Sequence, residues 1–270
     1  MTAFSLTARD GVRLEGHRYG ARHAGDPFEV VFLVAHGFTG HHLKPDVVRI
    51  TDTLREYGAV ISLSFRGHGS SGGHATFGVA EIDDLHDVVE YARSLGYRYV
   101  VTVGWSMGSS NVLLHGGAVT EGPGAADAVV SVSGASRWYL RDTAAMRRVQ
   151  WLLGTRSGRA VARLGLRTRI AKHGWGKRHE HAPPQPTDAI AQISPRPVLV
   201  VHGDADAYFT VEQPKALFEA ANEPKELWLI EGYGHAESSA TEEIVRGIGS
   251  KGRAMVGLGE ASGERATIEL

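Results

Sequence analysis

The feature that most constrains the fold is a series of short, almost uninterrupted apolar runs along the chain. These runs are VVFLVA (30–35), AVISL (59–63), YVVTV (99–103), AVVSV (128–132), PVLVV (197–201) and LWLI (227–230). A strand in the middle of a parallel sheet has both faces covered, so its sequence lacks the polar alternation of a half-exposed strand. The series therefore predicts a mostly parallel β-sheet that is buried on both faces.

Helical segments separate most of these runs. In 80–95, apolar residues recur at helical spacing and would form one face of a helix: Ile82, Leu85, Val88, Val89, Ala92 and Leu95. Alternating strands and helices imply right-handed crossovers and hence a doubly wound α/β fold. Before the first run, 4–19 alternates apolar and polar residues around Asp10 and Gly11, which predicts a hairpin. We expect this hairpin to form an antiparallel N-terminal edge of the sheet.

Composition limits the classes of protein to which the chain can belong. Of its 270 residues, 42% are apolar and 22% are charged, as in ordinary soluble globular proteins. The formal net charge of −1 does not favour nucleic acid, and the absence of cysteine excludes disulfides and cysteine-ligated zinc. Residues 1–11 lack the basic and apolar regions of a signal peptide, and no apolar run is long enough to span a bilayer. We therefore expect a soluble, cytoplasmic protein with no nucleic-acid partner and no membrane span.

One stretch departs from the regular alternation of strands and helices. Between 136 and 190, 55 residues separate two apolar runs, which is far more than a simple crossover needs. Within 137–181, twelve lysines and arginines outnumber two acidic residues, which gives a local charge of +10. A proline cluster, HAPPQP (181–186), ends the stretch and is typical of a hinge. We expect an α/β core in two parts, an inserted helical, basic cap and a flexible Gly-rich tail: core 1–135, cap 136–190, core 191–256 and tail 257–270.

The sequence GWSMG (104–108) follows the apolar run at 99–103 and precedes a stretch of helical character. A Gly-x-Ser-x-Gly turn between a strand and a helix holds its serine in a strained bend, with the hydroxyl clear of the sheet's carboxyl edge. The first N–H groups of the next helix point to the same place and favour negative charge that develops there. Ser106 is thus a candidate nucleophile; the alternative is a glycine-rich turn with an incidental serine.

A nucleophilic serine requires a base, and the base requires an acid that orients it. The chain has fourteen histidines, so position is the only useful criterion. His235 follows the last apolar run directly, in a glycine-flanked loop, and Asp204 and Asp206 follow the run before it. Parallel strands end at one edge of the sheet, so the loops that follow them bring these groups toward Ser106. The order Ser, Asp, His along the chain is the one that a nucleophile elbow of this type requires.

Five motifs occur in the order and context expected of one family. They are HGFTG (36–40), SFRGHGSSGG (64–73), GWSMGS (104–109), HGDAD (202–206) and GYGH (232–235). With them the chain resembles the α/β-hydrolases over residues 10–255, apart from the cap. It is most similar to the capped serine hydrolases, which include monoacylglycerol-lipase-like and cinnamoyl (feruloyl) esterase-like enzymes. Two positions depart from the family pattern, since Ser64 replaces the usual aspartate and Ser109 replaces a frequent glycine.

The resemblance implies a role for each residue of the site. Ser106 would attack the substrate, His235 would act as the base, and the HGDAD motif selects Asp206 as the acid. The backbone N–H groups of Phe38 and Met107 would form the oxyanion hole. A serine at the nucleophile position separates the chain from the dehalogenases and epoxide hydrolases of this fold, which attack with aspartate.

These assignments predict a serine hydrolase that cleaves carboxylic esters of small molecules through an acyl-enzyme, without a cofactor or a metal. A thioesterase or an acyltransferase that uses the same three side chains is an alternative. A non-catalytic, ligand-binding homologue is a third possibility, against which the complete set of three residues argues. The arginines of the cap either face solvent or attract an anionic substrate.

Other residues near the motifs allow weaker predictions. Trp105 and Tyr208 flank catalytic positions and are candidates for contact with the substrate. The sequence marks no face for an oligomer, and the oligomeric state stays open. Several histidines outside the site lack the regular spacing of metal ligands, and we expect them to be solvated or structural: His36, His41, His42, His68, His173, His179 and His181.

Overall fold

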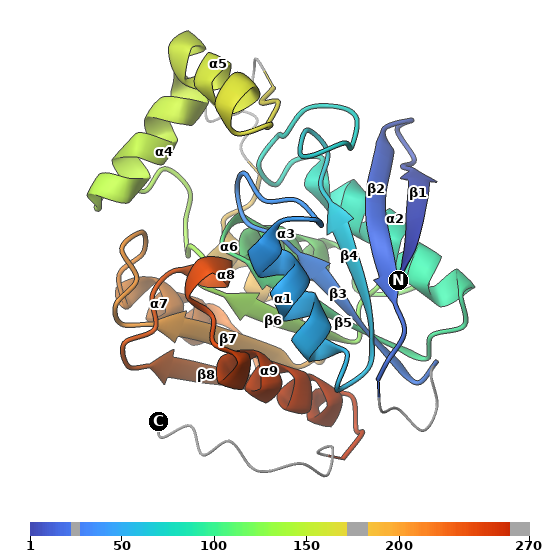
Figure 1. Ribbon diagram of the computed structural model, residues 1–270. Coiled ribbons are helices and arrows are strands. Elements are labelled where there is room, and N and C mark those ends of the chain that lie inside the picture. Colours follow the sequence, from blue (N-terminus) through green and yellow to red (C-terminus); the bar gives the residue numbers. More distant parts are fainter. Residues whose placement is uncertain (23–27, 172–182, 260–270) are drawn as a thin grey trace.

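The computed structural model describes residues 1–22, 28–171 and 183–259. Within them, eight strands form one sheet in the order β1-β2-β4-β3-β5-β6-β7-β8. The strands are β1 (Thr2–Thr7), β2 (Arg13–Tyr19), β3 (Val30–Ala35), β4 (Ala59–Ser64), β5 (Tyr99–Trp105), β6 (Ala128–Val132), β7 (Val198–Gly203) and β8 (Lys225–Ile230). β1 pairs with β2, and β2 with β4, in antiparallel fashion, whereas the other neighbours are parallel. The predicted fold class, a mostly parallel sheet with an antiparallel N-terminal edge, is confirmed (Figure 1).

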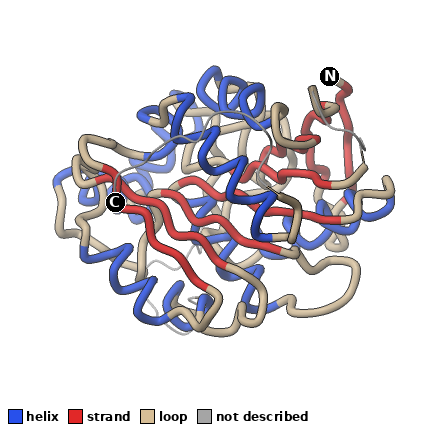
Figure 2. The backbone as a smooth tube through the Cα atoms, turned by 90° about the horizontal axis from the view of Figure 1, so that it is seen from below, coloured by secondary structure: helices blue, strands red, loops and turns tan. Residues whose placement is uncertain are grey.

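Helices cover both faces of the sheet (Figure 2). Those in the described residues are α1 (Pro45–Leu54), α2 (Glu81–Ser94), α3 (Met107–Ala118), α4 (Ala144–Gly154), α5 (Arg156–Gly165), α6 (Pro186–Ile190), α7 (Glu212–Ala220), α8 (Ala236–Ser239) and α9 (Glu242–Met255). The buried side chains of α1 and α9 belong to one core layer, and those of α2, α3, α6 and α7 belong to the other. None of these helices has the length and apolar character needed to cross a membrane.

The two core layers follow from the alternation of side chains along the central strands. In β3, Val31 and Leu33 pack in the layer of α2 and α3, while Phe32 and Val34 pack in the layer of α1 and α9. All four side chains are fully buried, which explains why the run contains no polar residue. Burial of one such side chain stabilises the fold by about 1.5–3 kcal/mol.

Between β6 and β7 the chain leaves the sheet and forms α4 and α5, which stand apart from the core (Figure 1). Both helices begin with a threonine N-cap, Thr143 and Thr155, and most of their residues are exposed or half-buried. Backbone bridges then tie Thr168 to His68 and Ile170 to Ala75, so this segment is fastened to the core.

The last helix of the predicted cap segment behaves differently from α4 and α5. Within the predicted cap boundaries, α6 packs against α3 and α7 of the core. The cap histidines at 173, 179 and 181 and most of the predicted tail lie outside the described residues. The two helices that rise above the sheet's carboxyl edge are therefore α4 and α5.

Candidate active site

Ser106 occupies the sharp turn between β5 and α3. Its backbone has φ 53° and ψ −113°, a left-handed region that side chains other than glycine rarely adopt. A Cβ on Gly104 would lie 2.3 Å from the Gly108 carbonyl oxygen, and a Cβ on Gly108 would lie 2.1 Å from that of Ala35. The turn therefore requires glycine at both flanking positions, and its strain holds the serine at the sheet's carboxyl edge.

The structure brings Ser106, His235 and Asp206 together. Nε2 of His235 lies 2.9 Å from the Ser106 hydroxyl, and Nδ1 lies 2.7 Å from Oδ2 of Asp206. The Asp206 side chain is fully buried and that of His235 is 15% exposed. Asp204, the other aspartate of this loop, accepts a hydrogen bond from the Gly232 N–H at 2.7 Å instead. Of the two aspartates, Asp206 alone contacts the imidazole.

Contacts on both oxygens hold the Asp206 carboxyl in place. Its second oxygen, Oδ1, accepts the backbone N–H groups of Tyr208 at 2.7 Å and Phe209 at 3.1 Å. The buried imidazole of His202 lies 3.7 Å from Oδ2, and burial lowers its pKa, so that it stays neutral. With Asp206 as the acceptor at Nδ1, the other ring nitrogen of His235, Nε2, faces the Ser106 hydroxyl.

The loop at 36–40, called here the oxyanion loop, passes beside the serine. Phe38 lies in this loop, and Met107 is the first residue of α3. Within the described residues, no hydrogen bond leads from the backbone N–H of either residue. Such free donors next to a nucleophile are what the stabilisation of a developing oxyanion needs.

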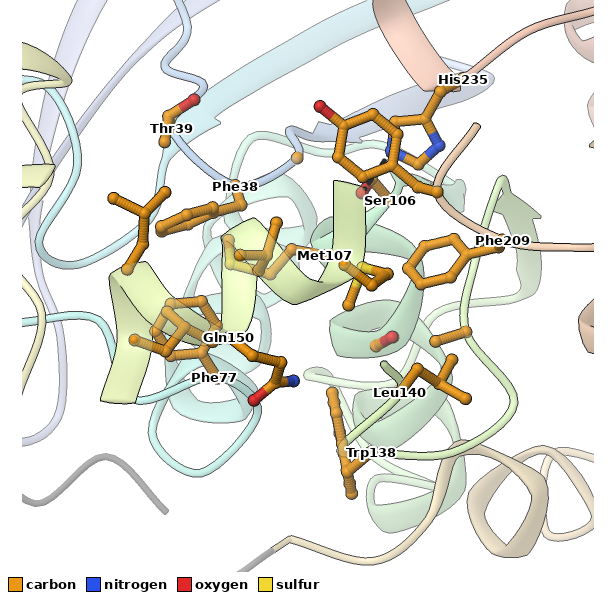
Figure 3. A pocket seen from close by; sticks show the side chains of 18 of the residues that line it. Phe38, Thr39, Phe77, Ser106, Met107, Trp138, Leu140, Gln150, Phe209 and His235 are labelled. Carbon is orange, nitrogen blue, oxygen red and sulfur yellow. Dashed lines mark hydrogen bonds between the residues drawn. The ribbon is translucent and has the colours of Figure 1, made fainter. Parts of the chain in front are cut away.

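A cavity of about 390 Å³ opens beside Ser106 and His235. Its volume lies within the range usual for small-molecule sites. Figure 3 shows Ser106 and His235 at one side, with Phe38 and Phe77 along one wall and Phe209 along another. The cap completes the wall with apolar residues of α4 and of the segment before it: Leu140, Met146, Val149, Leu152 and Leu153.

The two predicted substrate contacts have different positions. The ring of Tyr208 stacks on the His235 imidazole, with centroids 4.1 Å apart and planes at 28°, and it lines the cavity. Trp105 is fully buried in the core layer of α1 and α9, away from the cavity, so the prediction that it contacts substrate is wrong. The reason is the alternation of side chains along β5, which turns the residue before Ser106 into the core.

Most of the described arginines of the predicted cap are exposed. Arg147 and Arg148 of α4 are exposed, and neither forms an ion pair with a described carboxylate. Of the cap arginines, Arg137 lines the cavity, and it lies 3.6 Å from the Asp142 carboxylate. The charge is therefore concentrated away from the apolar interior of the cavity.

The two departures from the family pattern are both accommodated by hydrogen bonds. Ser64 accepts the backbone N–H of His42 at 3.1 Å, and its Oγ lies 2.7 Å from the His42 Nδ1. The side chains of Ser109 and Ser131 are 2.6 Å apart in the core. Both serines therefore support the structure around the site.

Among the described residues, one cluster has the composition of a metal site, namely His86, Asp87 and Glu90 on α2. The guanidinium of Arg9 already occupies it, with 2.7 Å between Nη2 and Oδ1 of Asp87. A cation is thus supplied by the chain itself, and none of the three residues lines the cavity.

The sequence analysis did not identify Glu237 as part of the site. Glu237, two residues after His235, lines the cavity, and its carboxyl accepts the Gly37 N–H at 2.6 Å. Nothing in the local sequence marks this contact, because its two partners lie 200 positions apart.

Comparison with known proteins agrees with the fold. The model of the alpha/beta hydrolase family matches residues 30–246, and the chain belongs to that family. The uncharacterized protein YqkD of Bacillus subtilis (strain 168) is 27% identical over 250 residues, which cover 88% of this chain and 73% of YqkD.

Solved structures with the same fold include several esterases. Est1E of Butyrivibrio proteoclasticus, solved with ferulic acid bound, is 21% identical with a TM-score of 0.66 over 94% of this chain and 99% of that one. The Pyrococcus furiosus esterase Pf2001 is 21% identical with a TM-score of 0.69, over 94% of this chain and 90% of that one. At 21% identity, the similarity to these two structures establishes the fold alone.

Proposed function

We propose that the protein is a serine esterase that cleaves carboxylic esters with its own side chains and works in a reducing compartment such as the cytoplasm. The observation that carries the proposal is the hydrogen-bonded series Ser106, His235 and Asp206 at the edge of an apolar cavity. Membership of the hydrolase family and the esterases among its structural neighbours support the same activity. The absence of cysteine is consistent with the location.

In the first step the Ser106 Oγ bonds to the ester carbonyl carbon while His235 Nε2 takes the hydroxyl proton. Asp206 accepts the Nδ1–H and stabilises the imidazolium that forms. The negative charge that develops on the carbonyl oxygen is met by the N–H groups of Phe38 and Met107. Each such donor lowers the barrier by about 3 kcal/mol, as deletions of oxyanion-hole donors indicate.

The tetrahedral intermediate then collapses, and the imidazolium returns its proton to the departing alkoxide. Water attacks the acyl-enzyme with His235 again as the base, and the carboxylic acid leaves as the Ser106 hydroxyl is restored. The stacked ring of Tyr208 limits the tilt of the imidazole through both steps.

The apolar lining of the cavity favours an uncharged acyl group. Its walls are mainly aromatic and aliphatic side chains, and burial of a carboxylate among them costs several kcal/mol. Among the described lining residues, the cations that could meet an anionic group are Lys44 and Arg137. We therefore expect R147Q/R148Q to leave the KM of neutral esters unchanged. A salt-sensitive rise in KM for anionic half-esters alone would show that the cap attracts anionic substrates.

The experiment that tests the proposal is kcat/KM on p-nitrophenyl esters from acetyl to palmitoyl, with Ser106→Ala as the blank. We expect a maximum at one chain length that is absent from the blank. Leu153→Trp narrows the cavity and should move the maximum to shorter chains. Leu164→Trp is the matched control, because Leu164 of α5 is 83% exposed and does not line the cavity. A response at the level of the blank for every ester would refute the proposal.

The same three side chains would also serve a thioesterase or an acyltransferase. A comparison of kcat/KM for an oxygen ester and a thioester with the same acyl group tests whether the protein is a thioesterase. Analysis of the products formed in the presence of an alcohol or an amine tests whether the protein is an acyltransferase.

A further inference from the structure

The side chain of Glu237 connects the loop that carries His235 with the oxyanion loop. Its Oε1 accepts the Gly37 N–H at 2.6 Å, and its carboxyl lines the cavity. A Cβ placed on Gly37 would lie 3.1 Å from Oε2 of Glu237 and 3.2 Å from the Cβ of Ser106. The carboxyl is thus packed against the peptide that runs beside the nucleophile. The mechanism proposed above does not use it.

Contacts within the loop hold the carbonyl of Gly37, and the hydrogen bond to Glu237 holds its N–H. The Gly37 carbonyl accepts the Gly40 N–H at 2.9 Å, and Nδ1 of His36 lies 2.7 Å from the same oxygen. Among the described residues, Glu237 alone binds the Gly37 N–H. The Phe38 N–H shares one peptide plane with the Gly37 carbonyl, which Gly40 holds. The bond to Glu237 holds the preceding peptide plane, so the two bonds together limit rotation about the Gly37 backbone and thereby the direction of the Phe38 N–H.

A second contact joins the same two parts of the chain. Arg49 of α1, the helix that follows the oxyanion loop, donates from Nη2 to the Glu237 carbonyl at 2.9 Å and from Nη1 to the Ala240 carbonyl at 2.6 Å. The segment with His235 and the segment with the oxyanion loop are therefore fastened to each other at two places. Of these two contacts, the hydrogen bond of the Glu237 side chain lies nearer to Ser106.

The chemistry of the carboxyl suits this position. Burial raises the pKa of Glu237 above its ordinary value, although the Gly37 N–H, His235 and Lys44 act to lower it. A carboxyl oxygen accepts the Gly37 N–H whether or not the group is protonated.

We propose that Glu237 is a positioning residue for the oxyanion hole, holding Gly37 so that the Phe38 N–H faces the carbonyl that Ser106 attacks. The inference rests on the proposed esterase mechanism and adds a residue to it. Glu237 acts through Phe38 and does not touch the reacting atoms.

The test compares Glu237→Ala, Glu237→Asp and Glu237→Gln on the best p-nitrophenyl ester. Glutamine keeps an acceptor at the same reach, aspartate is one methylene too short, and alanine has no acceptor. Glu231→Ala is the matched control, because Glu231 is an exposed carboxylate just before the same loop. Ser106→Ala is run beside them, and thermal unfolding verifies that each variant is folded.

We expect Glu237→Ala and Glu237→Asp to lower kcat by about 10- to 100-fold, with KM changed by less than about threefold. Glu237→Gln should recover most of the loss, and Glu231→Ala should behave as the wild type. A trifluoromethyl ketone with the same acyl chain adds to Ser106 Oγ as an oxyanion while His235 takes the proton. Its inhibition constant should rise by the same factor as kcat falls.

Two results would overturn the inference. One is a Glu237→Ala enzyme within about twofold of wild type in kcat, and the other is equal loss in the Gln and Asp variants. If Glu237→Ala does not fold, the comparison of Gln with Asp decides. Activity that survives in Ser106→Ala would refute the esterase mechanism itself and is thus distinguishable from failure of the role of Glu237.

Discussion

Gly108 is the position where the elbow is most sensitive to an added methyl group. A Cβ there would lie 2.1 Å from the Ala35 oxygen and 2.7 Å from the oxygen of His36. Both atoms belong to the backbone, so no side chain can rotate away. Overpacking of this kind costs about 1–3 kcal/mol, and we expect the upper end because β3 is held between β4 and β5.

Helix propensity opposes this cost in Gly108→Ala. Gly108 lies in α3, and alanine is favoured over glycine in a helix by about 1 kcal/mol. The net loss is therefore about 2 kcal/mol, which lowers Tm by about 4–8 °C in a chain of this size. Activity should fall as well, because β3 leads directly into the oxyanion loop.

Urea unfolding at pH 7 and kcat on a p-nitrophenyl ester measure both effects. Gly154→Ala is the matched control, since Gly154 is also helical but has nothing within 4 Å of an added Cβ. It should be as stable as the wild type or up to about 1 kcal/mol more stable. A Gly108→Ala protein as stable and active as Gly154→Ala would refute the close packing of the elbow against β3.

Three further predictions concern the acid, a buried histidine and the stacked tyrosine. Asp206→Asn should lower kcat by about 10⁴-fold through the wrong imidazole tautomer, while Asp204→Asn should retain activity; equal losses would contradict the assignment. Burial lowers the pKa of His115 to about 3, below its value in the unfolded chain. Below about pH 6.5 the unfolded chain therefore takes up a proton that the folded protein does not, and the free energy of unfolding falls as the pH falls. Between pH 7 and pH 5 the loss is about 2 kcal/mol, and His115→Gln should lose correspondingly less in urea unfolding; the same pH dependence in both proteins would refute this. Tyr208→Ala should lower kcat/KM about 2- to 10-fold by removing the ring stacked on His235, whereas Tyr208→Phe should not, and equal effects of the two changes would show that stacking is unimportant.

The strands of the sheet can be predicted from the sequence because a strand that is buried on both faces consists mostly of apolar residues. The run at 30–35 coincides with β3, and the helix predicted at 80–95 coincides with α2 to within a residue at each end. In both elements the periodicity of apolar residues is set by the neighbouring layers, and no distant contact is needed to recognise it.

The three candidate catalytic residues were predictable because each lies after the end of a strand. Ser106 follows β5 directly, Asp206 and His235 lie in the loops after β7 and β8, and parallel strands end at one edge. Trp105 shows that adjacency in sequence does not give a side chain its direction, which the alternation along β5 decides. Glu237 was not predictable, since its contact with Gly37 exists only once β3 and β8 are placed in one sheet.

The cap shows a second limit of sequence reasoning. Its basic composition and its length between two strands predicted an insertion, but did not locate its end. The predicted cap included α6, although α6 has no basic residue and α4 and α5 carry arginines. α6 is buried because Pro186, Ala189 and Ile190 pack on the core. That distinction depends on tertiary contacts.

The central claim is that Ser106 is an activated nucleophile, and active-site labelling tests it most directly. The folded protein is treated with a fluorophosphonate, and intact mass and peptide mapping locate the adduct. We expect one phosphonyl group on Ser106 in the wild type and none in Ser106→Ala. An unlabelled wild type, or labelling at another residue that is unchanged in Ser106→Ala, would contradict it.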